Sequence, residues 1–167
     1  MLSKAIIEEI NSQINEELFA WYTYLQMAVY CEGCNYPGFA TYMRHQAGEE
    51  HMHAMRLYNF LVEWGAPVEL RPIKKPLSRY KSLLDVFEKA LKAEQHVNDR
   101  VNALYERAFK EKAFAAHLQF EWFVSEQIEE VKTAQWIVEQ LRMANGEAAA
   151  MLLLDREAAK RAQEDQG

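Results

Sequence analysis

The chain has 167 residues, of which 50% are hydrophobic and 26% are charged, and its formal net charge is −6. This length and composition suit a single domain with its own apolar core, so we expect one domain over residues 1–167. The negative charge argues against binding to nucleic acids or anionic membranes. No apolar stretch approaches the roughly 18 residues that span a membrane, and the N-terminus lacks the pattern of a signal peptide. We therefore expect a cytoplasmic protein.

Glycine and proline divide the chain into candidate helices. Gly33 favours the end of a first helix, and Pro37 suits the first turn of a second one. Gly65 ends the second helix, and the three prolines that follow it predict an extended segment, because proline is not accommodated in a helix interior. Ser82, with an acidic residue three positions later, resembles a capping box and opens a third helix.

Residues 82–145 contain neither glycine nor proline. A single helix of this length would extend about 96 Å at 1.5 Å per residue, which is too long for the domain. The apolar stripe shifts by one residue after Ala108, and the charged residues 110–112 lie at the shift, so we place a turn there. Asn145 and Gly146 close the fourth helix, and a shorter fifth helix is expected at about residues 147–163.

Four long helices and one short helix, with no predicted strand, indicate an all-α bundle. The short turns make the first and second helices antiparallel neighbours, and likewise the third and fourth. The proline-containing segment between the two pairs is long enough to cross the length of the bundle. The predicted fold is therefore a four-helix bundle with one long crossover and a short fifth C-terminal helix.

Each long helix carries an inward stripe of apolar residues, spaced alternately by three and four, which is interrupted near its middle. The interrupting residues are Glu17, Glu50, Glu94 and Glu130, one on each helix. On the second helix we expect the stripe to extend to Trp64. On the third we expect it to comprise Leu84, Phe87, Leu91, Glu94, Asn98, Val101 and Tyr105.

Four buried carboxylates at one level would repel one another strongly, and a bound cation removes this conflict. Glu50 and His53 lie on one helix face, because three residues separate them. Carboxylates with a single imidazole and no thiol suit iron, and Glu50 is placed to bridge two ions. The alternative is a metal-free structural bundle in which some of these glutamates are solvated. Their recurrence in four separate stripes favours the metal site.

Cys31 and Cys34 form a Cys-x-x-Cys pair near the end of the first helix. The chain has only these two cysteines, so no second pair completes a zinc site. We interpret them as two independent thiols.

The whole chain resembles the non-haem bacterial and archaeal ferritins, from the first helix to the short fifth one. The matching motifs are Glu17 with Tyr24, Glu49-Glu50-x-x-His53, Glu94, and Ser125-Glu126-Gln127-x-Glu129-Glu130. The resemblance implies a ferritin-like fold and an iron-storage function with ferroxidase activity. Ferrous iron would be oxidised by O₂ at a di-iron site within one subunit, and ferric mineral would be deposited in a hollow shell of 24 subunits.

The resemblance also implies a role for each matching residue. One iron would be held by Glu17, Glu50 and His53, and the other by Glu94, Glu130 and the bridging Glu50. Gln127 would help to position oxygen or water beside the pair, and Tyr24 would be a nearby phenol that takes part in electron transfer. A possible third iron would be held by Glu49, Glu126, Glu129 and Glu130.

Two departures separate the chain from bacterioferritins, which carry haem. Their second Glu-x-x-His motif falls on Gln127 and Glu130 here, so that histidine is absent. Their haem-ligating methionine, directly after the bridging glutamate, is replaced by His51. We therefore predict no haem. A bacterioferritin-like haem protein and another kind of di-iron oxidase stay as alternative functions.

Overall fold

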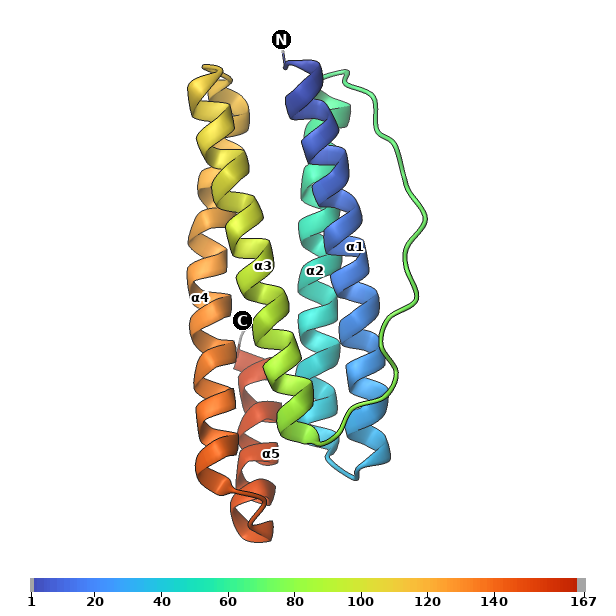
Figure 1. Ribbon diagram of the computed structural model, residues 1–167, viewed down its shortest axis with the longest axis vertical. Helices are drawn as coiled ribbons and strands as arrows, with labels where there is room; N and C mark the ends of the chain where they lie inside the picture. The colour runs from blue at the N-terminus through green and yellow to red at the C-terminus, as the bar shows by residue number, and fades with distance from the viewer. Residues whose placement is uncertain (1, 165–167) are drawn as a thin grey trace.

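The computed structural model describes residues 2–164, which form five helices in the predicted order (Figure 1). The helices are α1 (Lys4–Gly33), α2 (Pro37–Glu63), α3 (Leu83–Lys110), α4 (Phe114–Ala144) and α5 (Ala148–Glu164). This arrangement confirms the all-α class, the four-helix bundle and the short fifth helix. Within residues 2–164, no helix combines the length and apolarity needed to cross a membrane.

Local sequence explains where the helices begin and end. The Ser82 hydroxyl accepts a hydrogen bond from the backbone N–H of Asp85 at 3.1 Å, so the predicted cap of α3 is confirmed. Lys112 adopts a left-handed conformation, with φ of 55°, in the turn between α3 and α4 that the shift of the apolar stripe predicted. Asn145 and Gly146 both have positive φ angles and terminate α4.

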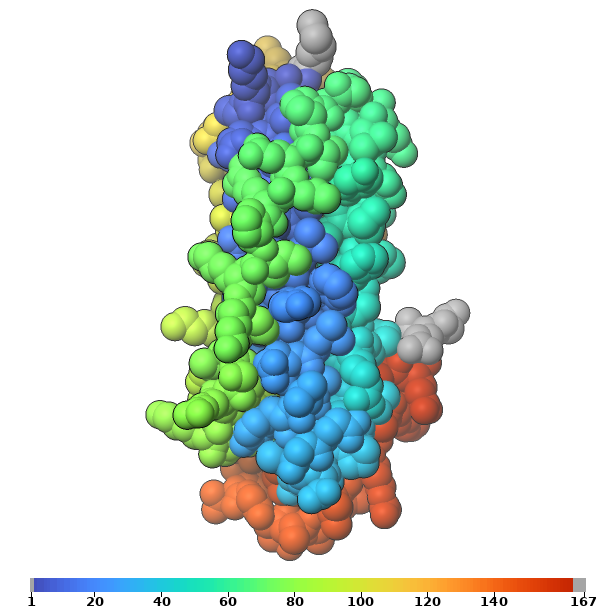
Figure 2. Space-filling model, turned by 90° about the vertical axis from the view of Figure 1, so that its right-hand side faces the viewer, coloured from blue at the N-terminus to red at the C-terminus, as the bar shows by residue number. Residues whose placement is uncertain are grey.

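The predicted crossover is confirmed as an extended segment that runs the length of the bundle (Figures 1 and 2). Figure 2 shows this segment lying along α1. Asn11 fastens its beginning, because the buried side-chain amide donates to the carbonyl of Pro67 at 3.0 Å and accepts from the N–H of Glu69 at 2.7 Å. These bonds satisfy backbone groups that have no secondary structure of their own.

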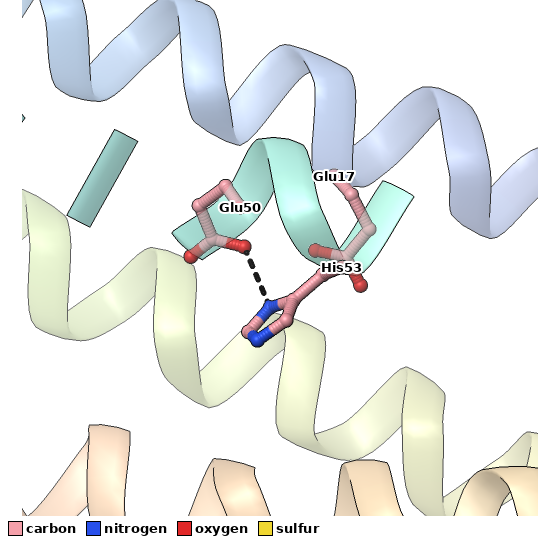
Figure 3. A group of neighbouring side chains, drawn as sticks. All are labelled: Glu17, Glu50 and His53. Atoms are coloured by element: carbon pink, nitrogen blue, oxygen red, sulfur yellow. Dashed lines mark hydrogen bonds and ion pairs between the residues drawn. The ribbon is translucent and has the colours of Figure 1, made fainter. Parts of the chain in front are cut away.

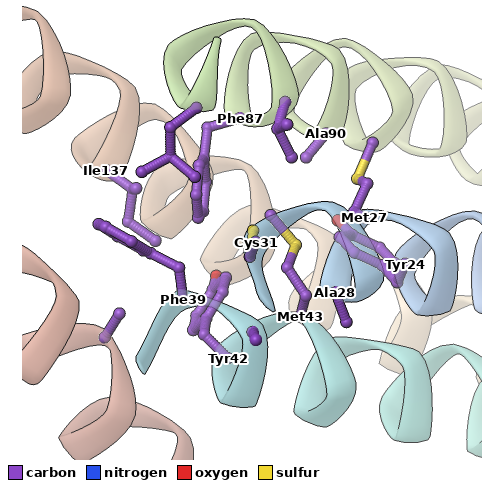
Figure 4. Packing of buried hydrophobic residues seen from close by; sticks show 14 of the residues in the cluster. Tyr24, Met27, Ala28, Cys31, Phe39, Tyr42, Met43, Phe87, Ala90 and Ile137 are labelled. Atoms are coloured by element: carbon purple, nitrogen blue, oxygen red, sulfur yellow. The ribbon is translucent and has the colours of Figure 1, made fainter. Parts of the chain in front are cut away.

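Two apolar clusters fill the bundle, one toward each end. One contains Phe39, Met43, Phe87 and Ile137 and packs where α5 covers the bundle (Figure 4). The other is built on α1–α4 around Ile10, Leu57, Phe120 and Phe123. Burial of each such large side chain stabilises the fold by about 1.5–3 kcal/mol. The layer between the clusters contains the polar residues described below.

Two details of the predicted stripes are wrong. Trp64 is 49% exposed, because it lies just beyond the last residue of α2. On α3 the buried stripe is centred one residue earlier than expected. It comprises Leu83, Val86, Phe87, Ala90, Glu94, Val97, Val101, Leu104 and Ala108, while Leu84, Leu91, Asn98 and Tyr105 are half-buried. The reason is that α3 packs extensively against α4 as well as against α1, so its inward face is broad.

The fifth helix folds back along the bundle and packs mainly on α2 (Figure 1). The buried Asp155 accepts a hydrogen bond from the N–H of Phe39 at 2.8 Å, in the first turn of α2. That N–H has no partner within its own helix, and the negative charge suits a helix N-terminus. At this crossing a Cβ atom on Gly38 would lie 1.8 Å from the carbonyl oxygen of Asp155. Glycine is therefore required for α5 to approach α2.

We expect Gly38→Ala to displace α5 and to lower the free energy of unfolding by about 1–3 kcal/mol, the range for forced overpacking. Chemical denaturation measures the loss, and limited proteolysis detects release of α5. Gly48→Ala is the control, since Gly48 also lies in α2 but has open space around its Cβ position. Equal stability and equal protease resistance of the two variants would contradict this account of α5.

Candidate metal centre

Five ionisable side chains converge between the two apolar clusters. Glu17 comes from α1, Glu50 and His53 from α2, Glu94 from α3 and Glu130 from α4, each near the middle of its helix. Antiparallel helices of similar length place their midpoints at one level, which brings the five together. Glu17, Glu50, His53 and Glu94 are buried, and the half-buried Glu130 has a side chain that is only 11% exposed. Figure 3 shows Glu17, from α1, and Glu50 and His53, from α2, pointing together into the interior of the bundle.

The five side chains form two overlapping sets of ligands. One set is Glu17, Glu50 and His53, and the other is Glu50, Glu94 and Glu130. Within each set, every residue offers a ligand atom that lies within 4.8 Å of the others. Glu50 belongs to both sets, so its carboxylate is placed to serve two ions at once. This is the grouping that the resemblance implied.

Neighbouring donors hold one oxygen of Glu17, one oxygen of Glu130 and both oxygens of Glu94. The Tyr24 hydroxyl donates to Glu94, the Gln127 amide donates to Glu130 and to Glu94, and the Gln13 amide donates to Glu17 at 2.8 Å. Such hydrogen bonds orient carboxylates before any ion binds. Of these residues, the resemblance implied Tyr24 and Gln127 as members of the site, although not as donors to the carboxylates, whereas Gln13 was missed.

Other buried oxygens have no donor. Among residues 2–164, Glu17 Oε2, Glu50 Oε1 and Gln127 Oε1 lack a hydrogen-bond partner. Leaving a buried acceptor without a partner costs about 1–3 kcal/mol. A cation between the carboxylates supplies what these atoms lack, so their chemistry fits bound metal ions.

The electrostatics of the site agree with this view. Burial raises the pKa of Glu17 to about 7, and burial with mutual repulsion raises the pKa of Glu50 and of Glu130 well above the ordinary value. Burial likewise lowers the pKa of His53 to about 4. At neutral pH the imidazole is therefore neutral and has a lone pair to offer. Protons on the carboxylates give way when cations bind.

Aromatic side chains enclose His53 on the side of α4. The ring of Trp122 meets the imidazole edge-on at 5.5 Å between centroids, and Phe123 does so at 5.6 Å. The guanidinium of Arg56 lies 4.0 Å above the Trp122 ring. This wall shields the imidazole from water and keeps its ring orientation.

Of the four residues predicted for a third iron, Glu130 belongs to the second ligand set, and the other three lie outside both sets. Glu49 is half-buried and accepts from the Gln46 amide at 2.8 Å, whereas Glu129 is exposed and lies 3.6 Å from the Lys132 ammonium. Within residues 2–164, neither these two nor Glu126 belongs to a cluster of three or more close ligand atoms. A third iron at this position stays a prediction.

The two cysteines are both free, with Cys31 buried and Cys34 exposed. Burial raises the pKa of the Cys31 thiol to about 12, so it is not a thiolate at neutral pH. Neither belongs to the two ligand sets found in residues 2–164.

An antiparallel four-helix bundle with one long crossover and inward carboxylates from all four helices defines the ferritin-like class of proteins. Comparison with protein families agrees, because residues 7–144 match the ferritin-like domain. The chain belongs to the ferritin family.

Its relatives include a bacterial non-heme ferritin and archaeal ferritins of known structure. It is 35% identical over 161 residues to the bacterial non-heme ferritin of Staphylococcus haemolyticus, covering 96% of this chain and 97% of that protein. Among solved structures, an open-pore ferritin from the archaeon Archaeoglobus fulgidus has a TM-score of 0.94 at 39% identity, covering 95% of this chain and 98% of that one. An engineered closed form of the A. fulgidus ferritin has a TM-score of 0.92 at 40% identity, with 95% and 97% covered. The resemblance to bacterial and archaeal non-haem ferritins is confirmed.

Removal of metal should leave a folded protein whose stability falls as the pH rises. The pKa of Glu17 is about 7 in the folded state, whereas its ordinary value is 4.5. Folding therefore takes up a proton between these two pH values. The stability that this proton uptake provides is lost as the pH rises from the lower value to the higher one. The pKa of His53 is lowered from 6.5 to about 4, so the stability contributed by its neutral imidazole is instead lost as the pH falls through that range. Four carboxylates with raised pKa outweigh one imidazole.

The measurement is denaturation of chelator-treated protein at several pH values between about 5 and about 7, the range of these titrations. Glu17→Gln removes one of the four groups and should flatten the dependence. Loading with Zn²⁺ should reverse the pH dependence of stability, because metal binding releases protons. The account is wrong if chelation unfolds the chain, or if Glu17→Gln leaves the slope unchanged.

Proposed function

We propose that this protein stores iron and oxidises Fe²⁺ with O₂ at the buried centre, releasing ferric iron into a hollow shell. The observation that carries the proposal is the shared carboxylate of Glu50, which joins two complete ligand sets. Each ferrous ion gives up one electron, whereas O₂ is reduced by two electrons to the level of peroxide. Two ferrous ions held side by side therefore supply the two electrons that O₂ takes up.

Each side chain has a task in this reaction. Glu17, Glu50 and His53 bind one ferrous ion, and Glu94, Glu130 and Glu50 bind the other. Gln127 orients Glu94 and Glu130 and has its own carbonyl oxygen free among the described residues. Burial and the nearby carboxylates raise the pKa of Tyr24, which keeps its hydroxyl protonated and donating to Glu94. The phenol is thus placed to supply an electron.

A third iron position is part of the proposal. Glu49, Glu126 and Glu129 would hold it together with Glu130, which also belongs to the buried centre. The negative charge of Glu49 helps to raise the pKa of Glu130, which places the two carboxylates within electrostatic reach. Such a position would receive iron that leaves the centre.

Substitution of single ligands should separate the two ions. His53→Ala should weaken the ion shared with Glu17, Glu130→Ala should weaken the ion shared with Glu94, and Glu50→Ala should weaken both. Each change should slow fast oxidation about tenfold or more, which corresponds to about 1.4 kcal/mol in the barrier. Anaerobic Fe²⁺ titration gives the stoichiometry, and stopped-flow absorbance gives the rate.

Glu139→Ala is the control, because Glu139 is an exposed carboxylate on α4 outside both ligand sets. Oxidation of two ferrous ions per subunit at the parental rate by Glu50→Ala would show that the bridged site is wrong. Haem in the purified protein, or turnover of an organic substrate, would instead indicate one of the alternative functions.

We propose further that 24 subunits assemble into the shell. Leu152 and Leu153 expose apolar side chains on α5, and Phe109, Phe114 and Leu118 do so around the turn between α3 and α4. Apolar patches at both ends of a subunit suit burial in contacts between subunits. The relatives include both an open-pore ferritin and a closed form, and we expect the closed 432 symmetry here.

Native mass spectrometry and electron microscopy after loading with Fe²⁺ test the shell and the mineral together. Leu153, which is 67% exposed, offers a specific probe. Leu153→Glu should yield smaller species with unchanged helix content, since it places charge in an apolar contact, while Leu153→Met should retain the shell. A parental chain that sediments as a monomer or dimer would contradict the proposal.

A further inference from the structure

A chain of hydrogen bonds links the metal centre to a cation on the bundle surface. Gln13 lies one turn before Glu17 on α1 and is 0% exposed. Its Nε2 donates to Glu17 Oε1 at 2.8 Å, and its Oε1 accepts from Nε of Arg100, on α3, at 2.8 Å. Arg100 also donates to the Ser12 hydroxyl at 3.1 Å. Two contacts on one guanidinium hold that group in a single orientation.

The chemistry of Arg100 determines which way the Gln13 amide points. A guanidinium has only donors and keeps its charge at every accessible pH, so it must face the carbonyl oxygen of the amide. The amide nitrogen then faces Glu17 and occupies Oε1. Among residues 2–164, Glu17 Oε2 is left as a buried oxygen without a hydrogen-bond partner, and it belongs to the carboxylate that the first ligand set uses.

We propose that Gln13 and Arg100 are positioning residues that restrict Glu17 to binding its ion through Oε2 alone. The inference rests on the proposed function only in taking the natural ion to be iron. A carboxylate with both oxygens free chelates a cation readily, whereas a strong hydrogen bond to one oxygen competes with the use of that oxygen as a second ligand atom. The ion shared with His53 is therefore held less tightly than the residue types alone would allow.

The charge behind this hydrogen bond distinguishes the two ions. Around the other ion, Glu94 and Glu130 receive hydrogen bonds from the neutral groups of Tyr24 and Gln127. Only the chain to Glu17 ends on a permanent positive charge, which opposes a cation two hydrogen bonds away. The ferric ion at Glu17 therefore dissociates more readily after oxidation than the other one. Such dissociation is needed before the next ferrous ion can bind.

Absorption of bound Co²⁺ tests the coordination without any oxidation step, because its visible bands weaken as its coordination number rises. In Gln13→Leu, Glu17 can offer both oxygens. One of the two bound ions should then show weaker bands and several-fold tighter binding. Arg100→Met should change the spectrum in the same direction, and Arg100→Lys, which keeps a charged donor, should restore most of the parental spectrum.

Arg107→Met is the matched control. Arg107 lines the same surface groove of about 500 Å³ between α1 and α3, but its guanidinium pairs with Glu9 at 2.9 Å and Glu111 at 3.8 Å. The Co²⁺ spectrum of Arg107→Met should be the same as that of the parental protein. In iron oxidation, Gln13→Leu should slow sustained turnover several-fold more than it slows oxidation of the first two ions, because the first ferric ion leaves slowly.

Parental or weaker Co²⁺ binding by Gln13→Leu, with only its stability lowered, would overturn the proposal and show that the chain merely satisfies buried polar groups. The proposed function fails separately. If the parental protein bound two Co²⁺ ions and Gln13→Leu changed the spectrum as expected, but O₂ did not oxidise bound Fe²⁺, the positioning role would stand and the ferroxidase proposal would not.

Discussion

Four carboxylates and one imidazole are buried together between two apolar clusters, and the other features of this bundle depend on how that arrangement is tolerated. Each buried charge is costly, and the raised pKa of Glu17, Glu50 and Glu130 records that cost. The clusters around Phe39 and Phe120 offset it, because each large buried side chain contributes about 1.5–3 kcal/mol. The helices thereby hold these carboxylates in an arrangement that bound cations, or protons in their place, stabilise.

The sequence predicted this site because its signal is local to each helix. One carboxylate in each apolar stripe, and the spacing of Glu50 and His53, indicate burial without knowledge of the partners. The fold followed from the same periodicity and from the placement of glycine and proline. On α3 the predicted stripe was right at Phe87, Glu94 and Val101, but its other members were placed one residue too late, as with Leu84 and Leu91 in place of Leu83 and Ala90. Periodicity alone does not reveal that a helix packs against two neighbours.

Contacts between distant residues were beyond the sequence. Gln13 and Arg100 are 87 residues apart, and each is of a type that is usually exposed. Asp155 and Phe39 are 116 residues apart, and the need for glycine at position 38 appears only once α5 crosses α2. These are the interactions that orient a ligand or dock a helix. Their physical reason lies in the assembled bundle and in no single segment of it.

Charge balance connects the buried carboxylates with a site that releases its ions. Four ionised carboxylates carry a charge of −4, which two ferrous ions neutralise, while His53 stays neutral. In the proposed reaction, oxidation to two ferric ions leaves an excess of two positive charges in a medium of low dielectric constant, with the cation of Arg100 close by. Oxide or hydroxide derived from O₂ and water can balance this excess, and ferric iron can depart with those anions. In the proposed reaction, the buried carboxylates that bind Fe²⁺ therefore also favour the departure of the oxidised product.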